Sequence, residues 1–202
     1  MSETKIVKLK LEDLGAGEKL PDLRQNPVET ALRIYEKTEI PPVSRPDERQ
    51  LIEANRYHAA FIEQTRDLDT TPEHLRELLR KLEAQHGDDE HFRHKAAVLL
   101  TVLMQHSSAE KFEIKPKKRL DFFGLMLNAD KEITVDGNVG NNLGHAMNDG
   151  KIIVKGNALK GTGSSKKGGY ILVEGDTGED TGEDERGGNI KVIGRRDNPY
   201  LK

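Results

Sequence analysis

The C-terminal third of the chain repeats itself every 19 residues. Three segments align without a gap, 132–150, 151–169 and 170–188, and a fourth begins at residue 189 and stops after residue 194. Each segment opens with an isoleucine and a valine two positions apart, so both side chains point to the same side of a short strand. The pairs are Ile133 and Val135, Ile152 and Val154, Ile171 and Val173, and Ile190 and Val192.

Glycines recur in three columns of this repeat. They indicate corners, where the chain takes a positive φ or passes close to a neighbour. The columns contain Gly137, Gly156, Gly175 and Gly194; Gly144, Gly163 and Gly182; and Gly150, Gly169 and Gly188. Short strands and corners at a fixed period predict a solenoid, in which each coil buries its apolar residues against the next. We therefore expect a short parallel β-helix of about three coils over residues 131–194, since a disordered glycine-rich tail would not keep a fixed spacing.

The repeat becomes more polar toward its end. The three apolar positions of its first coil are occupied by Val139, Leu143 and Met147, then by Ala158, Thr162 and Lys166, and finally by Thr177, Thr181 and Glu185. This trend predicts a solvated last coil. We expect the tail, residues 195–202, to fold over the open end, because a bare last strand would expose its edge.

The first half of the chain carries helix signals instead. After an extended or flexible segment, 1–24, we expect a helical domain over 25–110. Asn26-Pro27 and Thr71-Pro72 each place a capping residue before a proline at the first helical position. Helices are predicted from Pro27 to about 37, from about 46 to 66, from Pro72 to 86, and from a cap at Asp88 or Asp89 onward. The second of these would bury Leu51, Ala54, His58, Phe61 and Ile62. The predicted fold class is α+β, a small helical bundle followed by the β-helix.

Residues 111–130 are interpreted as a basic linker followed by an apolar plug. The run Lys115-Pro-Lys-Lys-Arg119 resembles a nuclear-import or phosphate-contacting sequence, but a solvated hinge is the favoured interpretation. The apolar residues that follow are expected to close the first end of the β-helix. They are Phe122, Phe123, Leu125 and Leu127.

Charge and composition exclude several classes of protein. The chain has 32 basic and 35 acidic residues, and neither half is basic, so no nucleic-acid partner is predicted. The absence of cysteine excludes disulfides, zinc–thiolate sites and a thiol nucleophile. The longest apolar run, residues 96–104, is too short for a membrane span, and no signal peptide is recognised. We expect a cytoplasmic protein with no membrane contact.

No catalytic or cofactor-binding residue is predicted. The glycines at 156 and 161 resemble a phosphate loop, but Thr162 stands where its lysine is required. Ser164 lies in a corner without the glycine–serine elbow of a hydrolase. The acidic residues Glu179, Asp180 and 183–185 are interpreted as a solvated face.

A candidate metal site lies in the helical half. Glu90, His91 and His94 are three and four residues apart, which can present them on one helix face. His58 or His74 is a candidate further ligand. The alternative is that these are solvated side chains at the start of a helix.

Two glycine-rich segments of the repeat resemble a known family. Gly137-Asn-Val-Gly140-Asn-Asn-Leu-Gly144 and Gly175-Asp-Thr-Gly178-Glu-Asp-Thr-Gly182 are similar to the Gly-x-Gly-x-Gly β-helix family, over residues 131–194. That family includes the C-terminal domain of the large chain of glutamate synthase and one of the chains of formylmethanofuran dehydrogenase. The resemblance implies a right-handed β-helix that braces other domains or subunits. In these enzymes the catalytic chemistry lies in other domains, so no catalytic residue is transferred to this chain.

These observations favour a non-catalytic interaction module, whose β-helix docks a partner protein or a second copy of itself. The alternative that the resemblance implies is an accessory subunit of an oxidoreductase assembly. A metal-binding helical domain is the third hypothesis.

Overall fold

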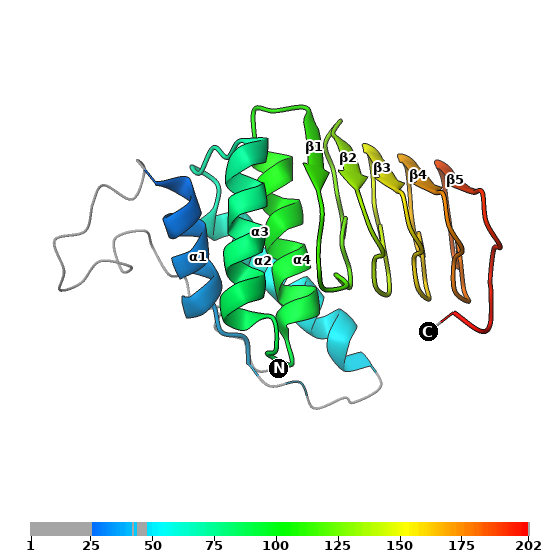
Figure 1. Cartoon of the computed structure of the whole chain (residues 1–202), viewed down its shortest axis with the longest axis horizontal. Coiled ribbons are helices and arrows are strands. Elements are labelled where there is room, and N and C mark those ends of the chain that lie inside the picture. The colour runs from blue at the N-terminus through cyan, green and yellow to red at the C-terminus, as the bar shows by residue number, and fades with distance from the viewer. Residues whose placement is uncertain (1–25, 42, 44–47, 202) are drawn as a thin grey trace, which may run out of the picture.

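The chain folds into a helical bundle followed by a stack of parallel strands (Figure 1). The structure, a computed structural model, describes residues 26–41, 43 and 48–201. The predicted flexible segment 1–24 lies outside them. The helices are α1 (Pro27–Lys37), α2 (Arg49–Gln64), α3 (Pro72–His86) and α4 (Phe92–His106); the strands are β1 (Lys111–Ile114), β2 (Glu132–Val135), β3 (Lys151–Val154), β4 (Tyr170–Val173) and β5 (Asn189–Val192). The α+β class and the order of its two parts are confirmed.

Two helices begin at the residues that the capping signals predict. The Asn26 side chain accepts the N–H of Glu29 at 3.2 Å and so caps α1. At α3, the Thr71 hydroxyl accepts the N–H of His74, whose ring accepts the N–H of Thr71 in return. The fourth helix differs from the prediction. Residues 88–91 form turns, and α4 begins only at the fully buried Phe92.

The buried face of α2 is rotated relative to the predicted face. Leu51, His58 and Ile62 are half-buried, whereas the fully buried side is defined by positions three and four apart. Its members are Glu53, Ala54, Tyr57, Ala60, Phe61 and Gln64. The prediction considered only apolar residues and therefore overlooked Glu53. This carboxylate is buried because it lies beside His94 and accepts a hydrogen bond from Arg49.

The β-helix has the predicted parallel register. Glu132 aligns with Lys151, and Lys151 with Tyr170, so that strand residues are stacked 19 apart. The Ile-x-Val pairs of β2, β3 and β4 point inward and are fully buried. The additional isoleucine of β3, Ile153, lies on the outer face and is half-buried. A second ladder joins Val139, Ala158 and Thr177 on another side of each coil. Backbone bonds also join the corners, where the N–H of Gly163 donates to the carbonyl of Leu143. Each coil is therefore held by backbone pairing along several lines.

The segment expected to be a linker contains the first strand of the sheet. β1 pairs with β2 in parallel, with Lys111 opposite Glu132, so these two strands are 21 residues apart instead of 19. Phe112 and Ile114 are buried at the positions that isoleucine and valine occupy in later coils. The β-helix thus has one coil more than the repeat alignment indicates. The alignment missed it because two extra residues shift the register and aromatic residues replace the usual ones.

The bundle covers the first coil of the β-helix. The N–H of Gly124 donates to the Thr101 hydroxyl of α4 at 2.9 Å, and the N–H of Asp121 donates to the carbonyl of Arg93. The predicted plug residues, Phe122, Phe123, Leu125 and Leu127, are all buried here. One continuous apolar core runs from α1 to β5. The helices therefore cap one end of the solenoid.

At the other end the tail folds over one side of the last coil but leaves the outer edge of β5 uncovered, so the prediction holds only for that side. The Thr177 N–H donates to the carbonyl of Arg195, and the N–H of Asn198 donates to the carbonyl of Thr177. The strand β5 itself pairs with β4 alone. Lys166, at the inward position of Met147, has a fully buried side chain and lies 2.9 Å from the Glu185 carboxylate. A charged pair thus replaces apolar packing where the stack ends.

Candidate functional site

Three polar side chains meet at the start of α4. Glu53 comes from α2, His91 from the turn that precedes α4, and His94 from its first turn. The Glu53 Oε2 atom lies 3.2 Å from His94 Nε2 and 3.4 Å from His91 Nδ1. One ligand atom from each residue lies within 4.8 Å of the other two. Among the described residues, this is the group of histidine and carboxylate side chains whose arrangement suits a metal ion.

A second layer of charged groups holds two of these three residues. Arg49 Nε donates to the other carboxylate oxygen of Glu53 at 2.8 Å. Glu90 Oε1 lies 2.9 Å from Nε2 of His91, on the side of the ring away from the cluster. Both outer groups are on the surface, since Arg49 is about half exposed and Glu90 largely exposed. The two carboxylates therefore have different roles: Glu53 lies inside the cluster and Glu90 supports it from outside.

Burial sets the protonation state of His94. The His94 side chain is only 4% exposed. Loss of hydration lowers the pKa of His94 to about 4, against the opposing pull of the Glu53 carboxylate. Its ring is therefore neutral at pH 7 and has a free lone pair. Tyr57, whose ring packs 5.8 Å from that of His94, has its pKa raised by burial to about 12 and keeps its proton.

The sequence-based candidates are only partly brought together. His91 and His94 converge, but Glu90 faces outward and Glu53 takes its place. Neither of the further candidates joins them: His74 belongs to the cap of α3, and His58 lies outside the group. The sequence contained one indication that Glu53 is buried. It lies four residues before Tyr57, and residues four apart share one face of a helix.

The basic run is already engaged by acidic side chains. Glu83 of α3 accepts the backbone N–H groups of Lys117 and Lys118 at 2.6 and 3.0 Å. The side chains of Lys115 and Lys118 pair with Asp136 and Asp88. The run and residues 136–138 line a hollow of about 570 Å³. The contacts of Glu83 and Asp88 join the run to the C-terminal end of α3.

A histidine and a serine of the repeat form a second contact that the sequence did not predict. His145 and Ser164 occupy equivalent positions in successive coils, and His145 Nδ1 lies 2.7 Å from Ser164 Oγ. The ring also packs edge-on against Phe122. In the described part of the chain no carboxylate is paired with this histidine, so the pair lacks the orienting acid of a hydrolytic triad. It is a contact along a column of the repeat.

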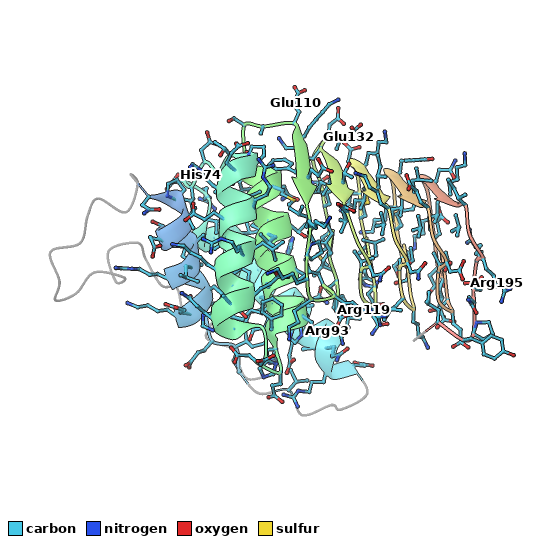
Figure 2. All side chains as sticks on the ribbon, viewed as in Figure 1. His74, Arg93, Glu110, Arg119, Glu132 and Arg195 are labelled. Atoms are coloured by element: carbon cyan, nitrogen blue, oxygen red, sulfur yellow. The ribbon has the colours of Figure 1, made fainter. Side chains whose placement is uncertain are left out.

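The last coil carries the most exposed apolar side chains of the described residues. Ile193 is 62% exposed and Tyr200 is 85% exposed. We call β5 together with residues 193–201 the free end. The acidic residues Glu179, Asp180 and 183–185 are also exposed nearby, and Asp180 pairs with Lys160 at 2.9 Å. The free end is visible beside the labelled Arg195 in Figure 2.

Comparison of the chain with models of protein families, with curated proteins and with solved structures finds no match. The resemblance to the Gly-x-Gly-x-Gly family thus rests on the repeat motif itself. Among the described helices, none has the length and apolar character needed to cross a membrane.

Proposed function

We propose that the chain is a non-catalytic interaction module that docks a second copy of itself through the free end of the β-helix. The observation that carries this proposal is the asymmetry of the sheet. β1 is covered by the helical bundle, whereas β5 has a strand partner on one side only. The exposed Ile193 follows directly at this open edge.

The open edge offers backbone groups as well as apolar surface. The outward N–H and C=O groups of an edge strand form a ready template for another strand. In the described structure the tail covers the side of the last coil around Thr177 and Thr181, not β5. A docking chain would therefore extend the sheet at β5.

Charge favours a second copy as the occupant. Acidic residues 183–185 and the exposed basic residues Arg186, Lys191 and Arg195 lie at the same end. A surface that carries both signs can be complementary to itself across a two-fold axis. The net charge of −3 is also too small to keep two copies apart.

Sedimentation velocity over a range of protein concentrations tests the proposal. We expect dimers of the wild-type chain, and a monomer when Ile193→Lys places a charge at the open edge. The matched control is Leu172→Lys, which adds the same charge to the half-buried outer face of β4, one strand away. This control should still dimerise. A wild-type chain that stays monomeric at high concentration would exclude self-association.

The accessory-subunit hypothesis uses the same surface with a different partner. Affinity purification from the native host, with wild-type and Ile193→Lys chains in parallel, separates the two. Recovery of a cofactor-bearing protein by the wild-type chain alone would replace the second copy as the occupant.

A further inference from the structure

We propose that Glu53, His91 and His94 form a binding site for a divalent transition-metal ion, with zinc as the first candidate. The site lies in the helical bundle, far along the chain from the free end, and does not depend on the docking function. It rests on the spacing of the three ligand atoms, on an unpartnered nitrogen inside the bundle, and on the outer contacts that orient the ligands.

The distances between ligand atoms fit a tetrahedral ion. Zinc binds histidine nitrogen and carboxylate oxygen at ~2.0–2.2 Å, so neighbouring ligands of a tetrahedron are separated by roughly 3.3 Å. The Glu53 oxygen lies 3.2 Å from the His94 nitrogen and 3.4 Å from the His91 nitrogen. The remaining separation, between the two nitrogens, is within 4.8 Å. A small rotation of the partly exposed His91 ring would bring its nitrogen closer to the nitrogen of His94.

The buried nitrogen of His94 has no hydrogen-bond partner. Its Nε2 atom is near the Glu53 carboxylate, but the direction of approach does not suit an N–H···O bond. A buried polar atom without a partner is costly. In a metal site the lone pair of each ligand points at the ion and not at the neighbouring ligand. The misalignment of this buried nitrogen therefore suits an ion between the three residues.

The outer contacts are those that metal-ligating side chains have. A ligating histidine usually has a carboxylate or carbonyl at its other ring nitrogen, which keeps the proton there and frees the ligating atom. Glu90 is in this position beside Nε2 of His91. Arg49 holds one oxygen of Glu53 and leaves Oε2 toward the histidines.

The donor set indicates which ion binds. Two imidazoles and one carboxylate suit zinc and its neighbours, whereas calcium and magnesium prefer all-oxygen sites. Three protein ligands leave a fourth position for water. His91 is 34% exposed, so solvent reaches this side of the cluster. The alternative is a cluster without an ion, in which protons alone join the carboxylate to the two rings.

Titration of the purified full-length chain with Zn²⁺ and Co²⁺, after treatment with a chelator, tests the site. We expect one ion per chain, and a visible Co²⁺ spectrum of four-coordinate type. His91→Asn should weaken Zn²⁺ binding by about 100-fold or more, and Glu90→Gln by about 10-fold to 100-fold. The matched control, Glu63→Gln, removes an exposed carboxylate from the same helix as Glu53 and should leave the affinity unchanged.

His91 and Glu90 are the decisive positions, because both are partly exposed and precede α4, whereas His94 is packed in the core. Circular dichroism verifies that each variant is folded. Zn²⁺ should raise the thermal midpoint of the wild type and of Glu63→Gln, and not that of His91→Asn. Absence of stoichiometric binding by the wild type would overturn the proposal and leave the proton-linked cluster. Equal affinity in His91→Asn and Glu63→Gln would overturn it as well.

Discussion

The helical bundle and the β-helix bury their polar groups by different means. In the bundle, Glu53 and His94 are enclosed by side chains from α2 and α4 and depend on one another's position. In the β-helix, the groups that must be satisfied are mainly backbone N–H and C=O, and each coil pairs them with the next. The bundle is therefore specified by side-chain packing, and the β-helix by repetition and by the backbone angles of its corners. The two parts should respond to different kinds of substitution.

The largest change in the free energy of unfolding is expected from removing a buried aromatic ring in the bundle. Phe61 is fully buried on α2, and Phe61→Ala should lower the free energy of unfolding by about 3–5 kcal/mol, through lost burial and the cavity left behind. Urea denaturation followed by circular dichroism measures the loss. Because one core joins both parts, amide exchange should become faster in β3 as well as in α4. Faster exchange in α4 alone would show that the two parts unfold separately.

A smaller effect is expected from adding one carbon atom at a corner of the β-helix. Gly150 has a φ of +86°, and a Cβ placed there would lie 2.6 Å from the carbonyl oxygen of Ala129. Gly150→Ala should therefore cost about 1–3 kcal/mol in the free energy of unfolding. Lys167→Ala, at an exposed side chain of the next coil, is the control and should change stability by less than about 0.5 kcal/mol. Equal effects of the two substitutions would contradict the role of backbone angles.

The smallest expected effect concerns how the free energy of unfolding depends on pH through a histidine of the β-helix. Burial lowers the pKa of His145 below its ordinary value of 6.5. The folded state therefore resists protonation of this ring, so its contribution to stability is present above pH 6.5 and is lost as the pH falls below that value. His145→Gln should flatten the decline of unfolding free energy between pH 7 and pH 5. Parallel curves for the two chains would contradict this assignment.

Most of the β-helix could be predicted from the sequence, because its determinants are local. The Ile-x-Val pairs and the glycine columns keep a fixed spacing, and that spacing alone determines the strand register. The first coil was not recognised, since β1 and β2 are 21 residues apart and the coil is lined by Phe112 and Phe123. Its contacts with α4 compensate for the departure from the repeat, and such contacts leave no periodic signal.

Two of the three residues of the polar cluster could be predicted from the sequence. His91 and His94 are close in the sequence, so their spacing reveals them. Glu53 is 38 residues before His91, and only the packing of α2 against α4 brings it to them. The cap at Asp88 or Asp89 was wrong for a related reason. Phe92 is the first residue of the buried face, and burial of that face decides where α4 begins.

The buried Lys166 also limits how this array can grow. Repeat proteins lengthen when a coil is duplicated. A copy of residues 132–150 inserted after Gly150 would stack its Leu143 and Met147 on the same residues of the original coil, so that apolar side chains meet. It would lengthen the stack by one strand spacing, ~4.8 Å. The same copy placed after Gly188 would set Leu143 and Met147 against Thr181 and the Glu185 carboxylate. We therefore expect a duplicated coil to keep the fold stable when it is inserted near the bundle, and to destabilise the fold when it is added beyond Lys166. The array can lengthen only from the end that the bundle covers.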